Sequence, residues 1–157
     1  MRNIIFLDVD GVLNSNNMCW NGIDVGEEFL VRLKTLVEQT KAEIVLSSTW
    51  RLFADTRRLL ARYFKLHNIP KWVDTTPNLE TVFRHEEIVQ WLEEEQFLAR
   101  FGIQDYRVLI IDDDRDAEIL PKDKGVAKDI MFIKTDPDRG FTQENLLSAL
   151  EFFKKDE

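Results

Sequence analysis

The feature that most constrains this chain is an apolar run that ends in two acidic residues. Residues 4–7 read Ile-Ile-Phe-Leu, and Asp8, Val9, Asp10 and Gly11 follow directly. The apolar run predicts a buried strand, in which residues i and i+2 point to the same side, so Asp8 and Asp10 can face one site. Two like charges this close repel each other unless a cation or a shared proton holds them. The spacing therefore indicates a metal-assisted acid/base or nucleophilic centre.

Further predicted strands and helices alternate along the chain, whose 157 residues fit a single domain over residues 1–157. Strands are expected over 43–47, 107–111 and 129–133, with a short one at 72–73, and helices over 27–41, 52–67, 84–100 and from Thr142 as N-cap. This alternation predicts an α/β fold, a three-layer Rossmann-like parallel sheet of about five strands with helices on both faces. Ligands of such sheets bind beyond the carboxyl ends of the strands, where Asp8, Ser47 and Asp113 all fall.

A second apolar run also ends in acidic residues. Residues 108–111 read Val-Leu-Ile-Ile, and Asp112, Asp113 and Asp114 follow, with Asp116 two positions further on. Carboxylates with no Cys or His nearby are the hard oxygen ligands that Mg²⁺ prefers. A solvated acidic loop is the alternative, but a buried strand that runs straight into these residues favours a site.

These two segments resemble motifs of the haloacid dehalogenase (HAD) phosphohydrolase superfamily. In that family the first acid of Asp-x-Asp-Gly is the nucleophile and the second is the general acid/base, which implies these roles for Asp8 and Asp10. The acid pair after the later strand positions Mg²⁺, which implies Asp113 as the direct ligand and Asp112 in support. The order of the acids leaves open whether Asp112, Asp113 or Asp114 binds the ion directly. The resemblance places Mg²⁺ between Asp8, the backbone carbonyl of Asp10, Asp113 and a phosphoryl oxygen.

Two further motifs of this superfamily bind the phosphoryl group. A strand that ends in Ser or Thr supplies a hydroxyl, which Ser47 matches with the adjacent Ser48 as an alternative, although these hydroxyls could instead cap the next helix. A Lys or Arg shortly before or at the start of the helix that precedes the fourth strand supplies a cation, for which Arg84 is the candidate and Lys71 the alternative. A charge on a helix surface is the plainer interpretation of Arg84.

The dipeptide Trp50-Arg51 is similar to one in small HAD-like proteins, including the HAD domain of bacterial Swiss Army knife RNA-repair proteins. The Arg51 guanidinium could hold a substrate anion in a fork, and a surface ion pair fits the sequence equally well. Arg57, Arg58 and Arg62 could form a cationic rim around the site, but an exposed helix face with Trp50 in the core is the favoured interpretation.

The resemblance implies Mg²⁺-dependent hydrolysis of a phosphomonoester through an aspartyl-phosphate intermediate. The intervals after Asn14 and Arg51 are too short for a large cap domain, so the site should be open to a phosphorylated substrate, either a small molecule or a nucleic-acid end. A nucleic-acid-end phosphatase in repair and a non-catalytic HAD-like binding domain are the alternative functions.

Composition and missing motifs argue against several other classes of protein. A formal net charge of −8 argues against bulk nucleic-acid binding, and no apolar run is long enough to span a membrane. The single cysteine, Cys19, allows no intrachain disulfide, as expected for a cytoplasmic protein. The sequence has neither a Cys-x5-Arg phosphatase motif nor a Gly-x4-Gly-Lys-Ser/Thr phosphate loop.

Overall fold

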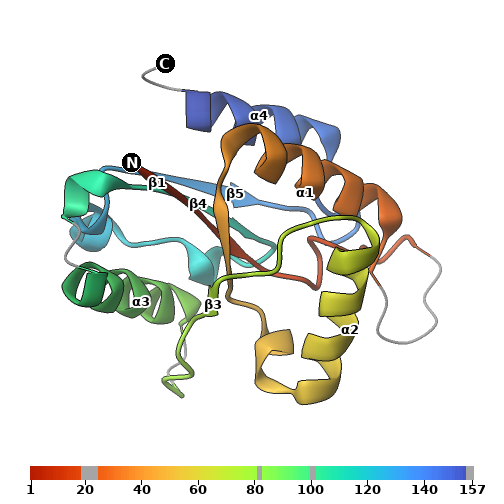
Figure 1. Cartoon of the computed structure of the whole chain (residues 1–157), viewed down its shortest axis with the longest axis horizontal. Helices are drawn as coiled ribbons and strands as arrows, with labels where there is room; N and C mark the ends of the chain where they lie inside the picture. The colour runs from red at the N-terminus through yellow and green to blue at the C-terminus, as the bar shows by residue number, and fades with distance from the viewer. Residues whose placement is uncertain (19–24, 81–82, 100–101, 155–157) are drawn as a thin grey trace.

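One sheet of parallel strands forms the centre of the molecule. The computed structural model describes residues 1–18, 25–80, 83–99 and 102–154. The strand order is β3-β2-β1-β4-β5 (Figure 1). From β1 the chain adds β2 and β3 on one side, and then returns to add β4 and β5 on the other side. The switch point of the sheet therefore lies between β1 and β4. The strands are β1 (Arg2–Leu7), β2 (Glu43–Leu46), β3 (Asp74–Thr75), β4 (Tyr106–Asp112) and β5 (Asp129–Lys134).

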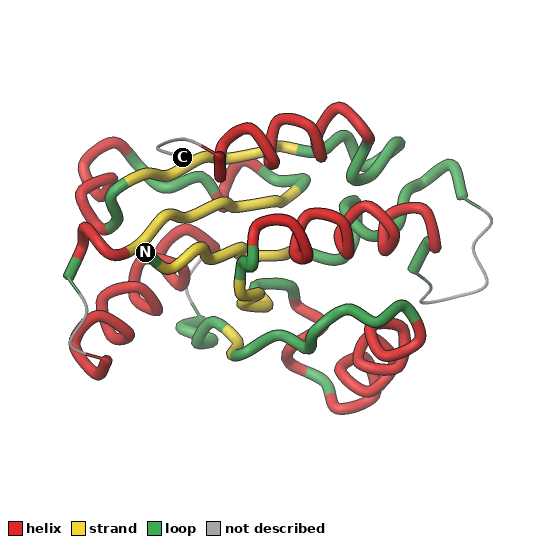
Figure 2. The backbone as a smooth tube through the Cα atoms, turned by 45° about the horizontal axis from the view of Figure 1, so that its top comes forward, coloured by secondary structure: helices red, strands yellow, loops and turns green. Residues whose placement is uncertain are grey.

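Helices cover both faces of this sheet, as the sequence predicts (Figure 2). Apolar side chains of α1 (Glu27–Thr40), α2 (Ala54–Leu66) and α4 (Gln143–Lys154) share one core with the sheet. The helix α3 (Arg84–Ala99) packs into a second core on the opposite face. The prediction of a three-layer α/β fold is therefore confirmed, and no described segment forms a large cap domain.

The alternation of side chains along β1 decides where its carboxyl end points. Ile5 and Leu7 belong to the core that includes α1 and α4, whereas Ile4 and Phe6 belong to the core that includes α3. Successive residues of a strand point to opposite faces of the sheet. Asp8 lies two residues after Phe6, so its side chain points to the same face as Phe6, the α3 face.

In-register pairing puts three polar residues side by side at the carboxyl ends of β2, β1 and β4. Leu7 pairs with the last residue of β2 and with Ile111 of β4. The next residues, Asp8, Ser47 and Asp112, are therefore neighbours at the spacing of adjacent strands, about 4.8 Å. The ladder continues here, because the Ser47 N–H donates to Leu7 O (3.0 Å) and the Asp8 N–H donates to Ile111 O (3.1 Å).

Most predicted elements overlap the observed ones, but the short third strand does not. It was expected at 72–73, and β3 is in fact Asp74–Thr75. Trp72 instead turns into the core, where its ring packs edge-on against Phe64 with the centroids 5.6 Å apart. The demand of a large aromatic side chain for burial thus shifts the strand toward its carboxyl end.

The N-cap predicted at Thr142 is confirmed. Thr142 Oγ1 accepts a hydrogen bond from the Asn145 N–H (3.2 Å), and Asn145 Oδ1 accepts one from the Thr142 N–H (3.0 Å). Phe141 and Leu146, which flank this entry to α4, are both buried. Among the described helices there is no candidate for a membrane span. Cys19 lies outside the residues that the structure describes.

Gly140 brings the chain from β5 to α4 through a close contact with α1. Its backbone has φ +70°, and an added Cβ would lie 2.7 Å from the Phe29 ring and 3.1 Å from the Asn14 carbonyl oxygen. The Gly140 N–H donates to Asp136 O (2.8 Å) and closes the turn. A side chain at this position would meet both a left-handed backbone and occupied space.

Gly140→Ala should therefore destabilise the protein. We expect the free energy of unfolding to fall by about 1–3 kcal/mol in urea denaturation followed by circular dichroism. Gly125→Ala is the matched control, because an added Cβ at Gly125 meets no atom within 4 Å beyond its chain neighbours. This control should leave stability nearly unchanged, and equal losses for the two variants would contradict the account of Gly140.

Candidate active site

Three carboxylates gather where β1 and β4 end. Asp8, Asp112 and Asp113 each offer one oxygen, and these oxygens lie within 4.8 Å of one another. Asp8 and Asp112 are buried, and Asp113 is half-buried. A set of hard carboxylate oxygens fits a divalent ion such as Mg²⁺.

The two acids that follow β4 differ in how far their oxygens are already engaged. Asp112 Oδ1 accepts a hydrogen bond from the Asp114 N–H (2.9 Å), and Asp112 Oδ2 accepts one from Arg84 Nη1 (2.5 Å). No described group donates a hydrogen bond to the Asp113 carboxylate. Asp113 therefore keeps both oxygens free for an ion.

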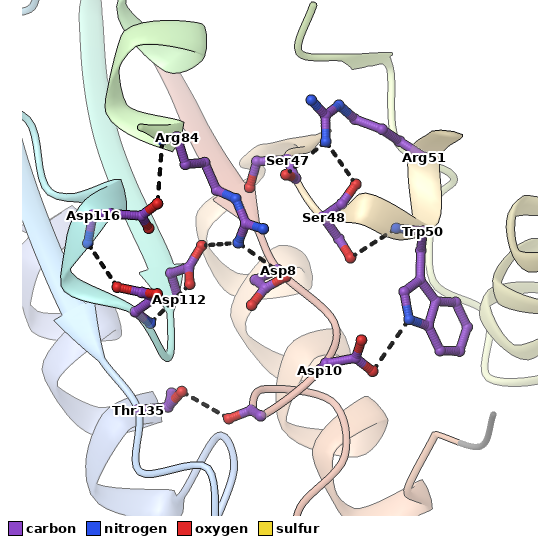
Figure 3. Close-up of polar contacts among 12 residues, drawn as sticks. Asp8, Asp10, Ser47, Ser48, Trp50, Arg51, Arg84, Asp112, Asp116 and Thr135 are labelled. Atoms are coloured by element: carbon purple, nitrogen blue, oxygen red, sulfur yellow. Dashed lines mark hydrogen bonds and ion pairs between the residues drawn. The ribbon is translucent and has the colours of Figure 1, made fainter. Parts of the chain in front are cut away.

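Arg84, the first residue of α3, reaches into this cluster. Its Nη1 lies 3.3 Å from Asp8 Oδ1 as well as beside Asp112 Oδ2 (Figure 3). Lys71, the alternative cation, lies instead beside the Trp72 ring, with its Nζ 5.2 Å from the ring centroid. Arg84 is thus the cation that offsets the repulsion between Asp8 and Asp112.

Burial makes Asp8 and Asp112 hard to ionise. Loss of hydration, and after it repulsion from Asp112, raises the pKa of Asp8 well above its usual value, although Arg84 opposes the shift. Loss of hydration likewise raises the pKa of Asp112 to about 6, again against the effect of Arg84. A bound cation would compensate for the burial of both carboxylates.

The two serines after β2 use their hydroxyls differently. Ser48 Oγ accepts a hydrogen bond from the Trp50 N–H (3.1 Å) and caps the 3₁₀ helix Thr49–Leu52. Ser47 is fully buried, and no described group hydrogen-bonds its hydroxyl. A buried hydroxyl without a partner is costly unless a ligand binds it. Ser47 therefore has the hydroxyl that is free for an oxyanion beside Asp8 (Figure 3).

Asp10 lies apart from the three-carboxylate cluster, on the loop after β1. Its side chain is exposed, and its Oδ1 accepts hydrogen bonds from Asn14 Nδ2 (3.0 Å) and Trp50 Nε1 (3.2 Å). Trp50 is buried, as its core interpretation expects, but its N–H points to Asp10 (Figure 3). Two donors on one oxygen fix the Asp10 carboxylate and leave Oδ2 without a donor among the described groups.

Gly11 lets the loop that carries Asp10 pass directly against Asp113. Its backbone has φ +79°, and an added Cβ would lie 2.7 Å from Asp113 Cγ. Thr135 Oγ1 donates to Gly11 O (2.7 Å), and the Gly11 N–H donates to Asn14 Oδ1 (2.8 Å). The glycine is therefore needed both for the turn and for the position of Asp113.

The Arg51 side chain is buried and uses all five of its N–H groups within the protein. Its acceptors, at 2.9–3.2 Å, are the backbone oxygens of Ser47, Ser48, Thr76 and Pro77 and the carboxylate of Glu87. No donor is left for a substrate anion, so the contacts do not support the fork predicted for Arg51. The side chain instead ties the turn after β2 to the segment after β3 and to α3.

Three residues that hold the site were missed by the sequence reasoning. Asn14 and Thr135 fix the loop after β1, and Glu87 pairs with buried Arg51 (3.1 Å). Thr135 follows the end of a strand, as Ser47 does, and that position was a readable signal. Glu87 is one of several acids on α3, and nothing in the local pattern separates it from the others.

A family of known proteins matches the chain over most of its length. The family described as "HAD domain in Swiss Army Knife RNA repair proteins" matches residues 4–146, which include all the site residues above. A search of curated proteins finds no match.

The stability that Asp112 contributes should depend on pH in the metal-free protein. Its pKa is about 6 in the folded chain and about 3.9 in an unfolded one, so the folded state binds more protons between these values. The free energy of unfolding should therefore fall as the pH rises from about 4 to about 6 and then level off, by about 3 kcal/mol relative to Asp112→Asn. Urea denaturation with a chelator, at pH values from 4 to 7, measures this difference.

Mg²⁺ provides the complementary measurement. Saturating Mg²⁺ should raise the stability of the wild-type protein above pH 6, and should raise that of Asp112→Asn less. A wild-type curve that runs parallel to the Asp112→Asn curve at every pH would contradict the electrostatic account of this cluster.

Proposed function

Because this chain belongs to the family of HAD domains in Swiss Army Knife RNA repair proteins, we propose that it hydrolyses phosphomonoesters with the help of Mg²⁺. The observation that carries the proposal is the convergence of Asp8, Asp112 and Asp113 beside the free Ser47 hydroxyl. Mg²⁺ held by these acids would neutralise negative charge on the phosphoryl oxygens.

Each side chain of the site has a role in this proposal. Asp8 attacks phosphorus and forms an aspartyl phosphate, while Asp10 gives its proton to the leaving oxygen and then takes one from the attacking water. The Ser47 hydroxyl donates to a phosphoryl oxygen, and Arg84 stabilises the negative charge of the transferred group. Asp113 supplies the carboxylate that is free to hold the ion.

Phosphorylated nucleic-acid ends are the substrate class that we favour. The support is the family match, together with the position of the acids at a strand end that no described cap domain covers. A phosphorylated small molecule is the second candidate, and a binding domain without catalysis is the third. Asp8 and Asp10 together disfavour the third, because binding alone needs neither a nucleophile nor a proton donor.

Asp8→Asn should abolish the hydrolysis of p-nitrophenyl phosphate and leave the fold intact. An amide is a poor nucleophile, so kcat should fall by about 10³-fold or more with Mg²⁺ at neutral pH. Asp55→Asn is the control, because the Asp55 side chain is 95% exposed on α2 and should not affect the rate. Near-full activity of Asp8→Asn would rule out Asp8 as the nucleophile, and an inactive wild-type chain would favour the binding domain.

Trp50→Phe tests the role of Asp10, because it removes the N–H that donates to Asp10 Oδ1 and keeps an aromatic ring. Loss of this hydrogen bond should misplace the proton donor. We expect kcat to fall about 10-fold for an alkyl phosphate, whose leaving group needs a proton. The fall should be smaller for p-nitrophenyl phosphate, whose leaving group is a stable anion.

Trp91→Phe is the matched control for this comparison. Trp91 is also buried and also donates its indole N–H to an aspartate, in this case Asp74 of β3 (2.8 Å). The control should keep the wild-type ratio of the two rates. Equal losses on both substrates for Trp50→Phe, or the same altered ratio for Trp91→Phe, would contradict the positioning of Asp10 by Trp50.

A further inference from the structure

A groove of about 580 Å³ lies between α2 and the segment that leads into β3. Its charged lining residues are Arg51, Arg57, Arg58 and Lys71, and its other lining residues are Ala54, Ala61, Trp72 and Thr75. No acidic side chain is among the described residues that line it. The charged side chains that line the groove are thus all cations, on a chain whose net charge is −8.

Three of these cations are available to a ligand. The ion pair of Arg58 with Asp55 is 3.5 Å long, and both side chains are mostly exposed, a geometry that contributes little in water. Arg57 Nη1 donates to Arg51 O (2.6 Å), which holds the guanidinium at the groove. Neither Arg57 nor Lys71 has an acidic partner among the described residues.

Arg51 joins this groove to the candidate active site. Its side chain forms part of the groove wall, and its Nη1 donates to the backbone oxygens of Ser47 and Ser48. The groove therefore begins at the residue that shapes the Ser47 turn.

We propose that the groove binds the sugar-phosphate backbone of a single-stranded nucleic acid whose terminal phosphate enters the acid site, an inference that rests on the proposed function. A polynucleotide carries a phosphate at every sugar, so the phosphates that follow the terminal one meet Arg57, Arg58 and Lys71. A phosphopeptide with one phosphate at the acids would leave these cations without an anion. The Trp72 ring is buried, so the groove recognises charge rather than base sequence.

The test compares substrates of increasing length. The kcat/KM is measured for 5′- and 3′-phosphorylated RNA of one, three and six nucleotides, with p-nitrophenyl phosphate as the reference. The wild-type protein should prefer the hexamer to the mononucleotide, and the preference should fall as the salt concentration rises.

Arg58→Glu/Lys71→Glu should remove most of this preference. We expect kcat/KM for the hexamer to fall at least about 10-fold, while hydrolysis of p-nitrophenyl phosphate stays within about twofold of wild type. The log–log salt dependence should flatten by about 0.7 for each phosphate that the protein no longer neutralises. A hexamer rate unaffected by this double substitution would overturn the proposal.

Lys122→Glu/Lys124→Glu is the matched control. It makes the same change of charge on the 3₁₀ helix Pro121–Val126, whose Val126 belongs to the core on the α3 face, and it should leave the length preference unchanged. Equal losses in both double variants would mean that net charge acts rather than the groove, which would overturn the proposal. A length preference for phosphopeptides that only Arg58→Glu/Lys71→Glu abolishes would overturn it as well.

Direct binding distinguishes failure of the groove from failure of the proposed function. Fluorescence anisotropy with a labelled RNA hexamer that lacks a terminal phosphate measures the groove without catalysis. If the wild-type protein hydrolyses none of the substrates, but Arg58→Glu/Lys71→Glu binds the hexamer more weakly than the control variant does, the groove is supported and the proposed phosphatase activity is overturned. If the wild-type protein is an active phosphatase, but the two double variants bind the hexamer equally well, the groove alone is overturned.

Discussion

The site depends on the repulsion between carboxylates that the sheet holds at one buried point. Asp8 and Asp112 are neighbours because β1 and β4 pair in register, and neither backbone can move away without breaking the ladder. Arg84 supplies one positive charge between them, which leaves an excess of negative charge once Asp113 is counted. A divalent cation would fit this excess, and the carboxylates that could hold it already converge, which would lower the cost of binding.

Hydrogen bonds from buried side chains keep the surrounding loops in register with this cluster. Arg51 ties together the turn after β2, the segment after β3 and α3, and α3 is the helix that begins with Arg84. Trp50, one residue earlier, holds the Asp10 carboxylate. Trp50 and Arg51, neighbours in one short 3₁₀ helix, therefore orient the proposed proton donor and the turn that carries Ser47, although neither side chain is expected to touch the phosphoryl group itself.

The sequence predicts those parts of the fold and site that follow from local periodicity. Apolar runs that end in Asp8 and Asp112 identify two strand ends. Because a parallel sheet brings the carboxyl ends of its strands together, the acidic cluster can be predicted from the sequence. The role of Arg51 is not, because its acceptors come from segments whose proximity no local pattern encodes. The short edge strand β3 is misplaced for a related reason, since the burial of Trp72 rather than a repeating pattern decides where the strand begins.

The close approach of Gly11 to Asp113 links these two positions in evolution. A Cβ at position 11 and the Asp113 carboxylate in its present position cannot both occupy this space, so a change at Gly11 would displace the Asp113 side chain. Relatives that have lost the acid would be released from this contact, although the left-handed backbone at position 11 would still favour glycine. Paired replacements at the two positions would therefore mark, in an alignment alone, the lineages in which the three-carboxylate cluster is no longer complete.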